Sequence, residues 1–235
     1  MRVRVNSDDT SDPASDQLNE LARRNALWNE FKYRQGSEIF RDAEPAVNVY
    51  QIREGAVRTY KLLSGGRRQI GAFHLPGDIF GIENSEVHRF TAQAIVTTSV
   101  RIAKRRVLVA GLAKDDIAAA NNVRELVTRA LEHVENHLLQ LGCQTALEKV
   151  AAFLLEMDRR LDQPEVMVIP MGRRDIADYL GLTLETVSRG LSALRDEGIL
   201  SFIGQTGRKI VLHDRTRLAQ HAMSPDPAAV RSEII

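Results

Sequence analysis

The sequence predicts an α+β protein with an N-terminal antiparallel β-roll, a long helix, and a C-terminal domain of helices followed by a β-hairpin. Three observations support this prediction. Short β-rich runs broken by glycines occupy residues 47–105, residues 115–141 contain no proline or glycine, and two helical patterns separated at Gly181 precede a hairpin pattern. The 235 residues suffice for two ordinary domains, and 43% hydrophobic with 27% charged residues is typical of a folded chain.

These patterns divide the chain into five expected segments. They are a mobile tail (1–16), a β-roll domain (17–114), a dimerisation helix (115–143), a helical domain with a hairpin (144–220) and a loose C-terminal tail (221–235). The two tails are assigned because their residues show no periodic apolar pattern.

Composition excludes several classes of protein. No stretch approaches the ~18 uninterrupted apolar residues of a membrane span, and residues 1–13 are polar where a secretory signal is apolar. We therefore expect a cytoplasmic protein with no membrane partner. The single cysteine, Cys143, excludes an internal disulfide and any metal site that needs several thiolates of one chain. We find no GxxxxGK loop, paired catalytic acids or nucleophile motif, so we do not expect an enzyme.

The first element after the tail is expected to be helical. Leu18, Leu21, Leu27 and Phe31 lie near helical spacing, which predicts a short amphipathic helix over residues 17–33.

Five β-rich runs then follow, and they predict the β-roll. The runs are VYQIREGAV, RTYKLL, RQIGAFHLPGDIFGI, RFTAQAI and VRIAKR. Short strands at regular spacing are typical of an antiparallel barrel or jelly roll. The clearest corner is HLPGD, because Pro76 fixes φ at the first central position of a β-turn and Gly77 tolerates the positive φ of the second.

The long helix over 115–143 carries a coiled-coil pattern. Apolar residues and one histidine alternate steps of four and three, as the a and d positions of a heptad do, at Val123, Val127, Ala130, Val134, His137 and Leu141. Leu126, Leu131 and Leu138 form a second stripe beside this seam. We expect one stripe to pack on the chain's own β domain and the seam to pair with a second copy. The alternative is a helix buried within one monomer.

Another helix is predicted over residues 145–161, with one apolar face. Thr145 followed by Glu148 fits a capping box at its start.

Residues 173–200 predict a helix-turn-helix. Ile176, Ala177 and Leu180 share one face of a first helix, and a break at residues 181–183 follows. Thr183 is a suitable N-cap for a second helix from Leu184, since its hydroxyl can accept a hydrogen bond from a first-turn amide. The second helix places Val187, Leu191 and Leu194 on its buried side.

The exposed face of this second helix has the chemistry of base recognition. Glu185, Ser188 and Arg189 are one turn apart, in the half that enters the DNA major groove in this motif. Arg189 can donate two hydrogen bonds to guanine, Glu185 can accept one from cytosine, and Leu184 can contact a thymine methyl. The alternative is a surface helix with a Glu–Arg pair worth only ~0.2–0.5 kcal/mol.

Two short strands, ILSFIG and RKIVLHD, flank GQTG and predict a hairpin wing after the two helices. Because the net charge is only +1, a DNA-binding face must come from local clusters of basic residues. We expect phosphate contacts from Arg173, Arg174, Thr183, Thr186, Arg208 and Lys209.

This order of elements over residues 20–215 resembles the CRP/FNR family of bacterial transcription regulators, with a cyclic-nucleotide-binding-like jelly roll and a winged helix-turn-helix. GLTLETVSR is similar to the FNR branch, whose recognition helices carry E-x-x-S-R, matched here by Glu185, Ser188 and Arg189. EKVAAFLLEM and the HRF at His88 resemble the FixK subgroup. The resemblance implies a homodimer on double-stranded DNA with TTGA-like inverted repeats, a contact with RNA polymerase, and activation of genes for low-oxygen or nitrogen-oxide metabolism.

The sequence departs from the family's ligand-binding members. Cys143 is alone, so an iron–sulfur cluster is not expected. The cyclic-nucleotide binders carry a Gly-Glu pair and an Arg-Ser or Arg-Thr pair, whereas here Ile82 separates Gly81 from Glu83 and Phe90 follows Arg89.

We therefore expect a regulator that needs no cofactor or small-molecule effector. The alternative is a ligand-gated regulator whose β-roll binds a nucleotide or haem, for which the candidate iron ligands are His74, His88, His133 and His137.

Overall fold

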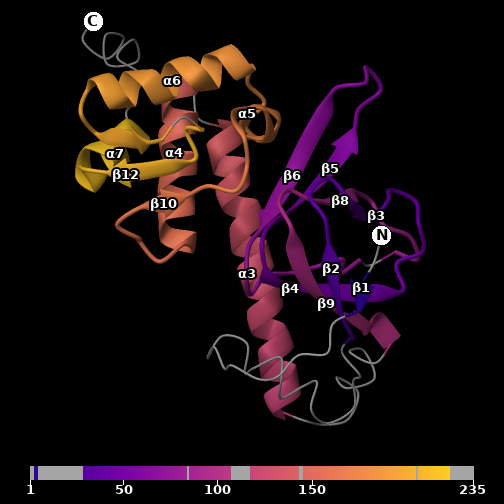
Figure 1. Ribbon diagram of the computed structural model, residues 1–235. Coiled ribbons are helices and arrows are strands. Elements are labelled where there is room, and N and C mark those ends of the chain that lie inside the picture. The colour runs from indigo at the N-terminus through magenta and orange to yellow at the C-terminus, as the bar shows by residue number, and fades with distance from the viewer. Residues whose placement is uncertain are drawn as a thin grey trace, which may run out of the picture. The chain divides into compact units, whose positions relative to one another are not determined.

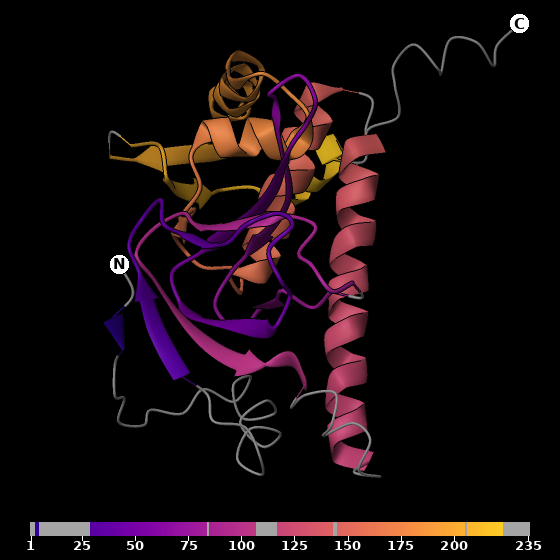
Figure 2. The same ribbon diagram turned by 90° about the vertical axis from the view of Figure 1, so that its right-hand side faces the viewer.

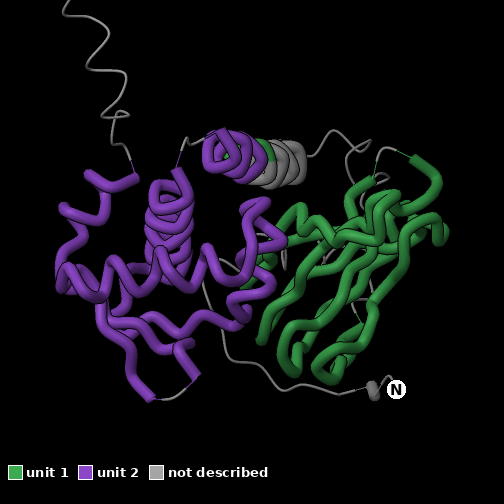
Figure 3. Tube along the Cα trace, turned by 90° about the horizontal axis from the view of Figure 1, so that it is seen from above, with its two compact units in different colours: residues 1–132 green, residues 133–235 purple. Residues whose placement is uncertain are grey.

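The computed structural model describes residues 3–4, 29–83, 85–106, 117–142, 145–204 and 206–222. The chain divides into two compact units, Met1–Glu132 and His133–Ile235 (Figure 3). The division falls inside helix α3 (Ile117–Gly142), whereas the sequence analysis treats this helix as a segment of its own. Residue 143 and the C-terminal residues 223–235 lie outside the described part, as do the predictions made for them.

The first unit is the predicted antiparallel β-roll (Figure 1). One sheet has the strand order β1-β2-β9-β4-β7, with bounds Val3–Arg4, Asn29–Tyr33, Thr98–Lys104, Asn48–Glu54 and Ile79–Phe80. The other has the order β3-β8-β5-β6, with bounds Glu38–Phe40, Thr91–Ala94, Val57–Leu62 and Arg68–His74. Side chains from both sheets form one core, which includes Tyr50, Ile52, Phe80, Val57 and Ala92.

The sequence locates the corner after His74 correctly. The predicted corner after His74 is a β-turn in which the Asp78 amide donates to the Leu75 carbonyl at 3.0 Å, and Gly77 has a φ of +91°. The Asp78 carboxylate also accepts from the Leu75 amide at 2.8 Å, which holds the turn closed.

The prediction of a helix over residues 17–33 is wrong for its last five residues. They form strand β2, in which Phe31 pairs with Val100 of β9, and residues 17–28 lie outside the described part. Phe31 and Tyr33 reach the same core because alternate residues of a strand share a face. Val3 and Arg4 form strand β1 against β2, although the sequence suggests only a tail there.

The second unit contains the predicted helix-turn-helix and hairpin. After α3 come α4 (Ala146–Arg160), β10 (Met167–Val168), α5 (Arg173–Leu180), α6 (Leu184–Asp196), β11 (Leu200–Ile203), β12 (Lys209–Leu212) and α7 (Arg215–Ala222). The three strands form one sheet in the order β10-β12-β11. Helix α3 runs without interruption (Figure 2). No helix among the described residues is long and apolar enough to cross a membrane.

Helix α7 was not predicted, and a partly buried ion pair fixes it to α4. The Arg215 guanidinium donates to both carboxylate oxygens of Asp158, at 2.8 and 3.0 Å, and Asp158 is 3% exposed. This bidentate geometry is the strongest form of such a pair.

Candidate nucleic-acid interface

The turn between α5 and α6 has the geometry that the sequence predicts. Gly181 ends α5 in the left-handed conformation, with a φ of 67°, and its amide donates to the Ala177 carbonyl. Thr183 then caps α6, because its hydroxyl accepts from the Thr186 amide at 3.1 Å. The two helices are therefore joined by a short connection with satisfied backbone groups.

Helix α6 has one buried and one open face. Val187, Leu191 and Leu194 are buried, as predicted. Glu185 and Arg189 are exposed, and Leu184, Thr186 and Ser188 are partly exposed. The residues expected to contact bases thus lie on the solvent side of a helix whose other side belongs to the core.

Glu185 is held as an anion at the start of α6. Its own amide and the Thr183 hydroxyl donate hydrogen bonds to the carboxylate, and the nearby Arg174 and Arg189 add positive charge, so that its pKa is lowered. An ionised carboxylate is an acceptor only, which is the state that can accept a hydrogen bond from a cytosine amino group.

The basic residues expected to contact phosphates lie at the start of α5 and on the wing. Arg174 and Lys209 are exposed, whereas Arg173 and Arg208 are partly buried. The Arg173 guanidinium lies 5.6 Å from the centre of the Phe202 ring, a cation–π contact that supports the wing as well as presenting charge. The two hydroxyls of Thr183 and Thr186 are 2.9 Å apart.

Helix α3 exposes an apolar stripe that differs from the predicted seam, because it combines Val134 and Leu141 of the seam with Leu131 and Leu138 of the second stripe. Leu131, Val134, Leu138 and Leu141 are 56%, 61%, 69% and 38% exposed, and their spacing of three, four and three is that of a heptad. The side chains of the other predicted seam residues, Val123, Val127 and Ala130, lie outside the described part.

His137 departs from the predicted seam. Its ring stacks on Tyr179 of the same chain, with ring centres 3.8 Å apart and planes 7° apart, and its Nε2 atom is 3.0 Å from the Tyr179 carbonyl oxygen. Leu138 takes the place of His137 in the exposed stripe. Heptad spacing alone cannot identify this contact, because its two residues are 42 positions apart.

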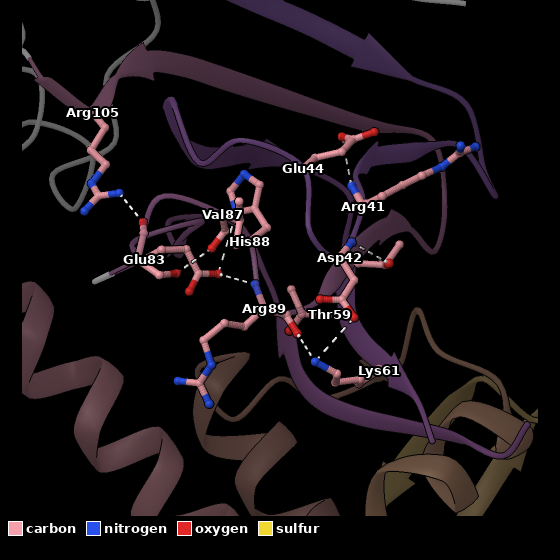
Figure 4. Close-up of polar contacts among 12 residues, drawn as sticks. Arg41, Asp42, Glu44, Thr59, Lys61, Glu83, Val87, His88, Arg89 and Arg105 are labelled. Carbon is pink, nitrogen blue, oxygen red and sulfur yellow. Dashed lines mark hydrogen bonds and ion pairs between the residues drawn. The ribbon is translucent and has the colours of Figure 1, made fainter. Parts of the chain in front are cut away.

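Glu83 and Arg89 lie where the family's nucleotide binders carry their Gly-Glu and Arg-Ser or Arg-Thr pairs, and the two residues contact each other within the described part of the β-roll. The Glu83 carboxylate accepts from the Arg89 amide at 3.3 Å and lies 3.6 Å from Nδ1 of the buried His88 (Figure 4). The Arg89 side chain is exposed and extends away from Glu83 (Figure 4). Phe90 packs over Gly71, where an added Cβ would lie 3.1 Å from the ring. Glu83 therefore makes a contact within the roll.

The four histidines considered as iron ligands each have a partner of their own. His74 lies 3.2 Å from the Thr59 hydroxyl, His88 stacks on Phe40, and His133 lies 3.1 Å from the Glu156 carboxylate, while His137 contacts Tyr179. In the described part of the chain, no three His, Cys, Asp or Glu side chains gather as a metal site would require.

Comparison with known proteins agrees with this architecture. Residues 30–115 match the cyclic nucleotide-binding domain family, and residues 148–221 match the Crp-like helix-turn-helix domain family. The solved structure of FixK2 from Bradyrhizobium japonicum is similar, with 54% sequence identity, a TM-score of 0.78, and coverage of 85% of this chain and 99% of that one.

Two curated relatives are also similar over most of their length. The nitrogen fixation regulation protein FixK of Azorhizobium caulinodans is 42% identical over 82% of this chain and 79% of its own. The transcriptional activatory protein AadR of Rhodopseudomonas palustris is 37% identical over 75% of each chain. This chain therefore belongs to the CRP/FNR family of transcription regulators, with a Crp-like helix-turn-helix DNA-binding domain and its greatest likeness among these relatives to FixK proteins.

Proposed function

We propose that the protein binds, as a homodimer, an inverted repeat with TTGA-like half-sites and activates transcription through RNA polymerase. The observation that carries this proposal is the exposure of Glu185, Ser188 and Arg189 on one face of a capped helix whose opposite face is buried. The family resemblance suggests genes for low-oxygen or nitrogen-oxide metabolism, and the name of AadR, a transcriptional activatory protein, favours activation. With DNA as partner, the protein acts in the cytoplasm.

Each residue of α6 has a distinct role in this proposal. Arg189 donates to guanine O6 and N7, and the anionic Glu185 accepts from the amino group of the paired cytosine. Ser188 and Leu184 contact neighbouring bases. Arg173, Arg174, Thr183, Thr186, Arg208 and Lys209 contact phosphates and so orient the domain without selecting a sequence.

The homodimer is inferred from α3. Four large apolar side chains at heptad spacing are exposed in the single chain, and a second copy of the same helix would cover them. A dimer with two linked helix-turn-helix units matches an inverted repeat, because each DNA half-site presents the same base edges to one of the two units.

We also infer that DNA binding needs no small effector, because Glu83 is engaged by Arg89 and His88 within the roll. The alternative is a regulator gated by a nucleotide or haem. An absorption spectrum and a mass spectrum of the purified protein distinguish the two, since a bound haem or nucleotide is visible in both.

The test of base recognition is a binding titration on operator variants. Replacing Arg189 with alanine should weaken binding to the full operator by about 1–3 kcal/mol and remove discrimination at one G·C pair in each half-site. Affinities are measured for the parent operator and for duplexes with that pair replaced.

Lys209→Ala is the matched control, because Lys209 is an exposed cation on the wing rather than on α6. It should weaken binding equally on all duplexes and reduce the salt dependence. If Arg189→Ala behaves in the same way as Lys209→Ala, then Arg189 contacts phosphate only and the proposed base recognition is wrong.

A further inference from the structure

Two adjacent arginines begin helix α5, and their surroundings differ. Arg173 and Arg174 are the first two residues of α5, and Gly172 before them makes no side-chain cap. Positive charges at a helix N-terminus are unfavourable next to the helix dipole, so the local structure of α5 gives no reason for either arginine. Arg174 is exposed, whereas Arg173 is partly buried and contacts the wing.

The Arg173 guanidinium lies against both arms of the wing. Its central carbon is 5.6 Å from the centre of the Phe202 ring on β11. On the other arm, Gly207 leads into β12, and a Cβ built at Gly207 would lie 3.2 Å from Nη2 of Arg173. Gly207 has a φ of +63°, so this glycine both permits the turn and leaves room for the guanidinium.

The register of the wing places this contact and the exposed lysine on opposite faces. Phe202 pairs with Ile210, which is fully buried. Ile203 pairs with Lys209, and both are exposed. Paired residues of an antiparallel ladder share a face, and consecutive residues alternate between faces. Arg173 therefore supports the hairpin from its core-facing side and leaves the face of Lys209 open to solvent.

Backbone pairing supports β11 less than β12. The Ile169 amide donates to the Arg208 carbonyl at 2.8 Å, and β10 pairs with β12 directly after it. In the described three-stranded sheet, β11 lies at the edge and pairs with β12 only. Ile203 at the end of β11 is 44% exposed. The contact between Phe202 and Arg173 thus holds the arm of the wing that the ladder holds least.

We propose that Arg173 is a positioning residue, which fixes the outer arm of the wing to the start of α5 so that the wing meets the DNA backbone in one orientation. The inference rests on the proposed function as a DNA-binding homodimer. A guanidinium suits this role better than an ammonium, because its planar group stacks on an aromatic face. Arg174, by contrast, is exposed near Glu185 and acts through its charge.

Substitution separates the charge of Arg173 from its contact with the wing. Arg173→Lys keeps a positive charge for a phosphate but removes the planar group that stacks on Phe202. Phe202→Leu removes the ring and keeps an apolar residue in β11. Because either change alone breaks the same contact, the losses in DNA affinity should not add when the two are combined.

The test is a fluorescence anisotropy titration of a TTGA inverted-repeat duplex at several salt concentrations. Arg173→Lys should weaken binding about three- to tenfold per half-site, although the charge is unchanged. The double variant with Phe202→Leu should bind within about twofold of the weaker single variant, whereas independent effects would multiply.

Lys209→Ala reports on the phosphate contact of the wing. In the wild-type background it should reduce the slope of log affinity against log salt concentration by about 0.9 per half-site. In the Arg173→Lys background the reduction should fall to about half of this value or less, because a loosely held wing no longer places Lys209 at a phosphate. A reduction as large as in the wild type would show that Arg173 does not act through the wing.

Arg174→Ala is the matched control. It removes the charge of the neighbouring residue and leaves the contact between Arg173 and Phe202 in place. This variant should bind more weakly and lose about 0.9 of the salt slope per half-site. Its loss should multiply with those of Phe202→Leu and Lys209→Ala, because its phosphate contact is independent of the wing.

The outcomes separate the inference from the proposed function. An Arg173→Lys protein that binds as tightly as the wild type, or whose loss multiplies with that of Phe202→Leu, overturns the inference while operator binding stands. A wild-type chain that binds no TTGA repeat at any salt concentration overturns the proposed function and the inference with it. Thermal unfolding and sedimentation show whether each variant is a folded dimer. If Arg173→Lys is not folded, a full effect of Lys209→Ala in the Phe202→Leu protein overturns the inference.

Discussion

Gly190 lies in the middle of the recognition helix, where glycine costs about 1 kcal/mol relative to alanine. The sequence offers no reason for it. In the structure, a Cβ added at Gly190 would lie 3.2 Å from a methyl group of Val150 on α4, which is closer than ordinary van der Waals contact. The missing side chain therefore allows α6 to approach α4 closely, and packing of the two helices offsets the lower helix propensity.

This explanation predicts different effects for two substitutions at the same residue. Gly190→Ala should change the free energy of unfolding by less than about 1 kcal/mol, because a small shift of Val150 is offset by better helix propensity. Gly190→Leu should destabilise the protein by ~2 kcal/mol or more through overpacking. Urea unfolding measures both.

Arg195→Leu is the control, because Arg195 is exposed on the same helix and its change to leucine should have little effect on stability. A Gly190→Leu protein as stable as the wild type would show that α4 and α6 do not need this close approach.

At the scale of single elements, helix starts are where local sequence determines structure most directly. The capping box predicted for α4 is present. The Glu148 amide donates to the Thr145 hydroxyl at 3.2 Å, and the Thr145 amide donates to the Glu148 carboxylate at 3.0 Å. Both bonds join residues three positions apart, so a pattern in the sequence is sufficient to predict them.

Thr145→Ala should lower the free energy of unfolding by about 1 kcal/mol, because a first-turn amide loses its acceptor. Thr145→Ser keeps the hydroxyl and should recover most of the loss. Thermal or urea unfolding of the two variants checks the prediction, and equal stabilities of the alanine and serine variants would show that the cap contributes nothing.

Strand β2, in contrast, depends on long-range pairing rather than on local sequence. Phe31 continues a helical spacing along the sequence, and the predicted helix ends at Tyr33, but both residues belong to strand β2. Pairing of this segment with β9 satisfies its backbone groups and places both rings at the core, and neither effect is visible in a window of a few residues.

For the whole molecule, the exposed stripe of α3 determines the proposed assembly. Replacing Val134 and Leu138 together with glutamate should yield monomers, because like charges would then face one another along the seam. The monomers should bind the inverted repeat far more weakly, since each contacts one half-site. Sedimentation velocity and an operator titration measure the two effects.

Leu62→Glu is the control, because Leu62 is 64% exposed on the β-roll and carries no seam contact in this proposal. That variant should stay dimeric and bind normally. A Val134→Glu, Leu138→Glu protein that remains a dimer would show that this stripe is not the interface.

The sequence alone determined the elements whose contacts are local. The helix caps, the turn at Gly181 and the buried face of α6 follow from residues within one or two helical turns of one another. The tertiary structure alone decided which side chains meet across the fold. Gly190 leaves room for Val150, Tyr179 stacks on His137 of the predicted seam, and Glu156 is contacted by donors from three helices. The physical reason is that these contacts, apart from the one between Glu156 and Arg160, join residues 16 to 42 positions apart, and such pairs become neighbours only when the helices pack.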